Sequence, residues 1–70
     1  MNENELLKIF SKNLKRLMEE EKIYQEDLAN EIGVSQSMIS RYIKGQSMPS
    51  FITIVKMSEA LFSSLDDFIK

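Results

Sequence analysis

Glycine and proline are scarce in this chain, whose 70 residues include two glycines and one proline. Sandwiches and barrels need many tight turns, which these residue types favour, so the scarcity disfavours both and favours helices joined by short links. A length of 70 residues predicts a single domain, residues 1–70. Hydrophobic residues make up 43% and charged residues 29%, which is typical of a globular chain rather than a disordered one. The sequence therefore predicts a small all-α domain.

Apolar residues recur at spacings of three and four in five segments, as expected for helices that bury one face. The expected helices span residues 5–20, 25–32, 35–44, 51–61 and 64–69. Gly33 and Gly45 are expected to end the second and third helices, and Ser35 and Ser50 to cap the third and fourth. In the fourth helix, the core spacing begins at Phe51.

Several classes of function lack the residues they need. The chain has no cysteine and no histidine, which removes disulfides, thiolate metal sites and the commonest general base. No glycine-rich phosphate loop is present, so we expect no enzyme, no cofactor and no metal, and no small-molecule ligand is implied. No apolar run approaches the length of about 18 residues that a membrane span needs. The start of the chain is acidic and polar, unlike a secretory signal, so we expect a cytoplasmic protein.

The charge of the chain is unevenly distributed. The net charge is −2, which taken globally argues weakly against binding nucleic acid. From Gly33 to Ser58, however, there is no Asp or Glu, while Arg41, Lys44 and Lys56 are basic. One face of the protein could therefore be positive although the whole is negative.

The most informative unit is the sequence QEDLANEIGVSQSMISRYIK, residues 25–44. It predicts a short helix, a turn at Gly33 and a second short helix, with Ala29 small enough to let the two helices cross closely. The outer face of the second helix is polar and neutral to basic. Such a helix fits the major groove of DNA, which is about 12 Å wide, and can offer hydrogen-bonding side chains to base edges.

In this unit and around it, the sequence resembles the Cro/repressor-type, or XRE, helix-turn-helix family over residues 10–68. The residues that carry the resemblance are Leu14–Lys15–Arg16–Leu17, Gln25, Leu28–Ala29, Ile32–Gly33–Val34–Ser35, Ile39–Ser40, Gly45, Pro49–Ser50 and Ser64–Leu65–Asp66–Asp67–Phe68. The resemblance implies a five-helix lambda-repressor-like fold. It also implies a sequence-specific transcriptional regulator that binds double-stranded DNA at a two-fold operator as a homodimer, with the third helix in the major groove.

The resemblance also assigns roles to individual residues. Gln25 corresponds to a position that contacts a phosphate, and Ser35 to a cap residue near the DNA backbone. Gln36, Ser37 and Arg41 correspond to positions that reach bases, with Ser40 close to them. Lys44 corresponds to a phosphate-contacting corner. Their chemistry suits these roles, because Gln can pair with adenine and Arg with guanine through two hydrogen bonds each.

Some assignments have alternatives. Arg41 could instead be a surface cation paired with Glu31 or Glu26, and Gln36 or Ser37 could be solvated surface residues. Lys12 and Arg16 are either further phosphate contacts or ordinary surface charges. Each alternative predicts a different set of partners for the side chain in the fold.

The sequence departs from the family pattern at several positions. Many relatives carry an ion pair of arginine and glutamate at the positions of Met18 and Ile43, so we expect these two apolar side chains to pack together instead. Tyr24 replaces the usual capping Ser or Thr, and either lies along the DNA backbone or packs on the third helix. Phe62 replaces a glycine and either fills the core or is exposed. If exposed, it is a candidate dimer contact with Leu65 and Ile69.

A second class of function is a protein-interaction module, such as the antitoxin of a toxin–antitoxin pair. The acidic net charge slightly favours this alternative. The absence of acidic residues from the third helix speaks against it. Fold alone cannot decide between the two, because one scaffold can host both functions.

Overall fold

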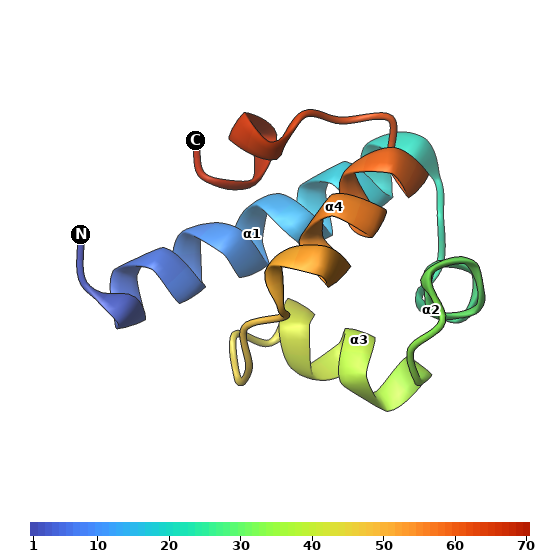
Figure 1. The fold of residues 1–70 in the computed structure, drawn as a ribbon, viewed down its shortest axis with the longest axis horizontal. Helices are drawn as coiled ribbons and strands as arrows, with labels where there is room; N and C mark the ends of the chain where they lie inside the picture. The colour runs from blue at the N-terminus through green and yellow to red at the C-terminus, as the bar shows by residue number, and fades with distance from the viewer.

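The computed structural model describes all of residues 1–70 and contains four α-helices and no strand. The helices are α1 (Glu3–Glu21), α2 (Gln25–Ile32), α3 (Gln36–Ile43) and α4 (Phe51–Ala60). The long α1 runs across the molecule, with α3 on one side and the C-terminal segment on the other (Figure 1). Helix α2 packs against both α3 and α4. No helix combines the length and the apolar character needed to cross a membrane.

The prediction of a fifth α-helix is wrong. Within residues 64–69 the chain makes one turn of 3₁₀-helix, η1 (Leu65–Phe68), held by short-range bonds such as that from the Ile69 amide to the Asp66 carbonyl, 3.1 Å. An isolated α-helical turn is costly to nucleate, and a segment this short has too few residues to repay that cost. The all-α class is confirmed, with four helices instead of five.

The predicted helix starts are confirmed where a serine precedes the helix. The hydroxyl of Ser35 accepts a hydrogen bond from the Met38 amide, and that of Ser50 accepts one from the Thr53 amide, both at 3.2 Å. Tyr24 precedes α2 but makes no such bond through its side chain. Helices α3 and α4 are therefore capped by side chains, and α2 is not.

Each of the four helices is followed, within two residues of its last residue, by a residue with a positive φ angle. These residues are Lys22 (56°), Gly33 (77°), Gly45 (71°) and Phe62 (53°). In each case the amide of the next residue bonds the carbonyl five positions earlier, for example Gln46 to Arg41 at 2.9 Å. Glycine adopts this conformation readily, so the two predicted stops are explained. Lys22 and Phe62 adopt it despite their side chains.

One core joins all four helices and η1. Its buried apolar residues are Phe10, Leu14, Leu17, Met18, Leu28, Ala29, Ile32, Ile39, Tyr42, Met57, Ala60, Leu61 and Phe68. Phe68 from η1 stacks its ring on Phe10 of α1, with ring centroids 5.5 Å apart. Phe51 was expected in this core but is 68% exposed. As the first residue of α4, it has the right helical spacing but no neighbouring element to cover it.

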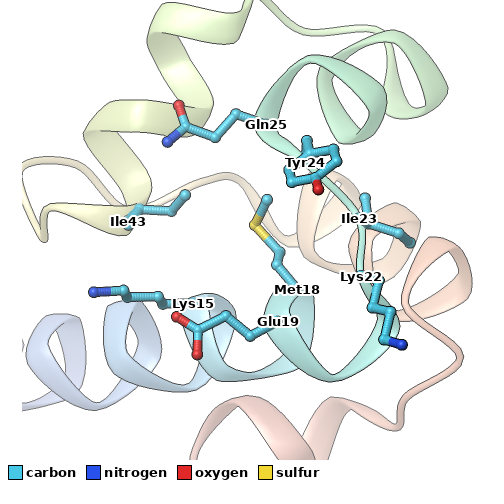
Figure 2. Close-up of a pocket in the computed structure, with 8 residues that line it drawn as sticks. All are labelled: Lys15, Met18, Glu19, Lys22, Ile23, Tyr24, Gln25 and Ile43. Atoms are coloured by element: carbon cyan, nitrogen blue, oxygen red, sulfur yellow. The ribbon is translucent and has the colours of Figure 1, made fainter.

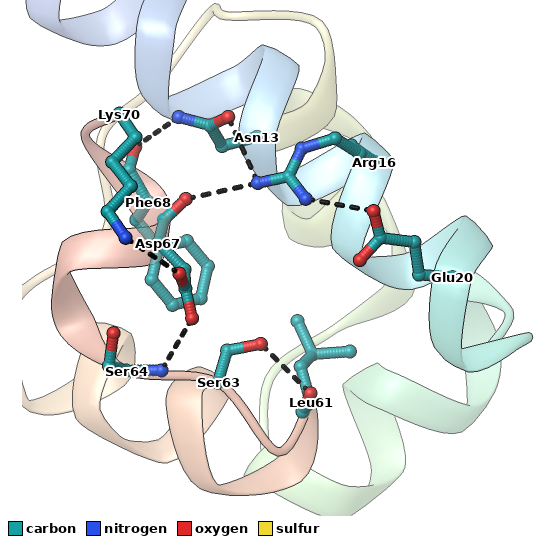
Figure 3. Close-up of polar contacts among 9 residues, drawn as sticks. All are labelled: Asn13, Arg16, Glu20, Leu61, Ser63, Ser64, Asp67, Phe68 and Lys70. Carbon is teal, nitrogen blue, oxygen red and sulfur yellow. Dashed lines mark hydrogen bonds and ion pairs between the residues drawn. The ribbon is translucent and has the colours of Figure 1, made fainter.

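Polar contacts fasten the C-terminal segment to α1 (Figure 3). The buried side-chain amide of Asn13 donates to the Phe68 carbonyl at 2.9 Å. Arg16 pairs with Glu20 at 2.9 Å and makes longer contacts, 3.4 Å, with the Asn13 side chain and the Asp67 carbonyl. These contacts fix the face of α1 that lies against the C-terminal segment.

Candidate nucleic-acid interface

Helix α3 packs against the core through its apolar side, and this packing fixes its orientation. Ile39 is fully buried and Tyr42 is 6% exposed, so this side packs into the core. Gly33 allows the sharp turn before α3 through its positive φ of 77°, and no atom lies within 4 Å of where a Cβ would be. Backbone conformation, rather than space, therefore requires glycine there. Since one side of α3 is buried, its opposite side must face the surroundings.

The predicted base-contacting residues lie on that outward side. Gln36, Ser37 and Arg41 are exposed, and Ser40 is half-buried. Positions one turn apart share a helical face, so Gln36 lies near Ser40, and Ser37 near Arg41. The structure thus brings these four side chains together on one accessible surface, which we call the α3 face.

The α3 face has polar groups available for a ligand. The side chains of Arg41 and Gln36 have no hydrogen-bond or ion-pair partner within the protein, so Arg41 does not pair with Glu31 or Glu26. Ser37 shares a hydrogen bond with Ser35, their hydroxyl oxygens 3.1 Å apart. The guanidinium and the amide can therefore bond to an external group without breaking an internal contact.

The remaining predicted residues border the α3 face. Gln25 is the first residue of α2, half-buried, and its side chain extends toward α3 (Figure 2). Lys44 follows the last residue of α3 and is exposed. Ser35 is used as the cap of α3. The predicted site residues thus lie at the start of α2, along α3 and at the two ends of α3.

The close approach of the turn after α3 to α1 was not predicted. A Cβ built on Gly45 would lie 3.3 Å from the Ser11 hydroxyl oxygen, a tight contact. The turn that follows Lys44 is therefore held against α1, which restrains the backbone at Gly45 and Gln46.

The alternatives for α1 are partly resolved. Arg16 pairs with Glu20 and contacts the C-terminal segment, so a phosphate would have to compete with these partners. Lys12 is exposed, and its role stays a prediction.

Two of the departures from the family pattern are also resolved. Phe62 is 83% exposed, which excludes the alternative that it fills the core. Tyr24 is 77% exposed, which argues against packing on α3.

Met18 and Ile43 line a common hollow from α1 and α3 (Figure 2). A hollow of about 440 Å³ opens here between α1, the start of α2 and α3. That the two side chains pack on each other, as expected from the sequence, stays a prediction. The helical periodicity of the sequence does not predict this hollow. The signal that could have revealed it is the pair of apolar residues at positions where many relatives carry charges.

Comparisons with known proteins agree with the fold. A family model described as "Helix-turn-helix" matches residues 14–68. The chain is 31% identical over 62 residues to "Uncharacterized HTH-type transcriptional regulator YqaE" of Bacillus subtilis (strain 168). The aligned segment covers 89% of this chain and 53% of that protein. The chain thus spans about half the length of that relative.

Two solved structures are similar. The restriction-modification controller protein C.AhdI from Aeromonas hydrophila has a TM-score of 0.82 and 27% identity, covering 89% of this chain and 94% of that one. The SOS-response transcriptional repressor LexA from Eubacterium rectale has a TM-score of 0.89, covering 100% of this chain and 74% of that one. At 24% identity, the second supports the fold alone.

The family match covers most of the chain, including α2, the turn at Gly33 and α3. The family is one of regulators and not an enzyme class. The chain belongs to the XRE-type helix-turn-helix family of DNA-binding transcriptional regulators.

Proposed function

We propose that the protein is a sequence-specific repressor-like regulator that inserts α3 into the major groove of DNA. The observation that carries this proposal is the α3 face, where Arg41 and Gln36 are exposed and have no internal partner. Arg41 would pair with a guanine and Gln36 with an adenine, with Ser37 and Ser40 beside them.

Contacts to the DNA backbone would surround these base contacts. Gln25 would bond one phosphate from the start of α2, and Lys44 another from the end of α3. Ser35 would lie near the backbone as the cap of α3. No Asp or Glu occurs from Gly33 to Ser58, so α3 and the turn that follows it bring no acidic side chain to the phosphates.

We propose that the protein binds a two-fold operator as a homodimer. A net charge of −2 gives one copy little general attraction to DNA, so a second copy would supply needed affinity. The exposed Phe62, Leu65 and Ile69 near the C-terminus are candidates for the contact between copies, at 83%, 41% and 50% exposure. Half-sites would lie one helical turn apart, about 34–36 Å.

A gel-shift titration with genomic fragments at several salt concentrations tests the function. We expect binding that weakens as salt rises, because phosphate contacts release counterions. The second candidate is a protein-interaction module, which the exposed Phe51 and Ile52, both 68% exposed, favour. The absence of a shift at low salt, together with co-purification of a partner protein, would favour that candidate.

A further inference from the structure

The hollow beside the α3 face has an apolar floor. It opens between the C-terminal half of α1, the turn before α2 and the end of α3, with a volume of about 440 Å³ (Figure 2). Met18, Ile23 and Ile43 supply the floor, and each of them packs against or belongs to the core. Pockets for small molecules occupy about 300–1,000 Å³ and combine an apolar lining with a few polar groups. The hollow has the size and the lining of such a pocket.

The polar groups around the hollow have no partners in the protein. Lys15, Glu19, Lys22, Tyr24 and Gln25 line it, and no side-chain hydrogen bond or ion pair involves any of them. Exposed charges elsewhere on α1, such as Lys8, Lys12 and Glu21, also lack partners, so this alone does not distinguish the rim. What distinguishes it is that its unpaired polar groups surround an apolar floor.

The charges of the rim favour an anionic ligand. Lys15 and Lys22 carry two positive charges and Glu19 one negative charge, so the rim keeps one net positive charge. Gln25 and Tyr24 add an amide and a hydroxyl that can donate to an oxygen. The Tyr24 ring, 77% exposed, offers a face for stacking. We propose that the hollow binds a small aryl carboxylate, with its ring on the apolar floor and its carboxylate toward Lys15 and Gln25, whose side chains extend to the same side of the hollow in Figure 2.

This site would regulate DNA binding, a consequence that rests on the proposed function. Gln25 borders the hollow and is also the proposed phosphate contact at the start of α2. A carboxylate bonded to Gln25 engages the side-chain amide that the phosphate contact also uses, and it brings a second negative charge next to the phosphate. The bound ligand and the DNA therefore compete, and the ligand releases the regulator from its operator.

Binding is tested without DNA, by titrating the full chain with naphthalene-2-carboxylate and following its backbone amides by NMR. A ligand of this size is expected to bind with a Kd of about 1 mM, and the amides of Met18, Tyr24 and Ile43 should shift. The neutral alcohol and the cationic amine of the same ring should bind several-fold more weakly. No shift at these amides, or equal binding of the amine, would overturn the proposal.

Two sets of variants place the ligand. Ile43→Trp fills the hollow and should abolish the shifts, whereas Ile52→Trp, on the exposed side of α4, should leave them unchanged. The double variant Lys15→Gln and Lys22→Gln changes only exposed side chains and should remove the preference for the anion. Retention of wild-type binding by either pocket variant would contradict the site.

Regulation is tested separately by fluorescence anisotropy of labelled duplex. A saturating amount of naphthalene-2-carboxylate should weaken DNA binding by at least about fivefold, a typical coupling between sites. Unchanged DNA affinity in the presence of bound probe would refute the competition. If the protein binds no DNA at all, the proposed function fails, while the NMR titration still decides whether the hollow binds the anion.

Discussion

The side-chain amide of Asn13 donates a hydrogen bond of 2.9 Å to the backbone carbonyl of Phe68, 55 residues further along the chain. Both residues are buried, and the ring of Phe68 stacks on the ring of Phe10, which lies on α1 together with Asn13. The bond therefore satisfies a buried carbonyl that η1 cannot satisfy itself, while the stacked rings supply the apolar contact. Together they dock the C-terminal segment on α1.

Replacing Asn13 with leucine keeps the size of the side chain but leaves the Phe68 carbonyl without a donor. We expect the free energy of unfolding to fall by about 1–3 kcal/mol, the cost of an unsatisfied buried acceptor. Urea denaturation followed by circular dichroism measures the change. Lys12→Leu, at the neighbouring exposed position, is the matched control and should have little effect. Equal stability of Asn13→Leu and wild type would show that the bond is not needed.

The left-handed backbone at Phe62 offers a test of strain. This conformation costs a non-glycine residue about 1–2 kcal/mol, and the Phe62 side chain is 83% exposed, so little packing is lost on its removal. Phe62→Gly should raise the free energy of unfolding of the monomer by up to about 1 kcal/mol, after the entropy of glycine in the unfolded chain is subtracted. Phe62→Ala, which keeps a Cβ at the same φ, should not.

The same variants report on the proposed dimer. Analytical ultracentrifugation should show weaker self-association for both Phe62→Gly and Phe62→Ala, because both remove the exposed ring. If both variants dimerise like the wild type, the contact between copies lies elsewhere.

Asp67 should contribute to acid sensitivity. Its carboxylate accepts a hydrogen bond of 2.9 Å from the Ser64 amide, which lowers the pKa of Asp67 below its ordinary value of 3.8. Because the pKa is lower in the folded state, ionised Asp67 stabilises the fold above that ordinary value, and the stabilisation is lost as the pH falls through the folded-state pKa. Asp67→Asn should therefore lose stability near neutral pH and show a smaller acid-induced decrease.

Asp66 provides the control for this test. It is exposed, one residue away, and makes no side-chain bond to Ser64. Thermal denaturation of Asp66→Asn should follow the wild-type dependence on pH. A wild-type pH dependence for Asp67→Asn would exclude the Ser64 contact as its source.

The sequence predicted those parts of the fold that depend on local chemistry. Ser35 and Ser50 cap their helices, and Gly33 has the positive φ expected after α2, since these residue types have strong intrinsic preferences. Lys22 and Phe62 adopt the same positive φ against the preference of residues that carry a side chain. Their residue types give no signal for this conformation, and Phe62 is marked only by the resemblance, in which a glycine is usual at its position.

Long-range features also escaped prediction. Arg16 has the spacing of a surface cation on α1, but its partners include the Asp67 carbonyl, 51 residues away. The hollow at Met18 and Ile43 depends on how α1 and α3 diverge, which periodicity does not encode. The residues of the α3 face were located because their exposure follows from one helix with a buried opposite side.

Lys44 should act on phosphate alone. It is exposed at the end of α3 and has no internal ion pair. Lys44→Ala is expected to weaken binding about equally for all DNA sequences and to reduce the slope of log affinity against log salt by about 1. Fluorescence anisotropy at several salt concentrations measures both. A variant that loses affinity for one sequence only would assign Lys44 to a base.

The most direct test of the α3 face is to select bound duplexes from a random pool with the wild type and then measure Arg41→Ala on the selected duplex and its single-base variants. We predict that Arg41→Ala loses about 1–3 kcal/mol of binding free energy and no longer discriminates at one base pair of each half-site. Unchanged affinity and unchanged discrimination at every base pair would contradict the assignment of α3 as the helix that reads DNA.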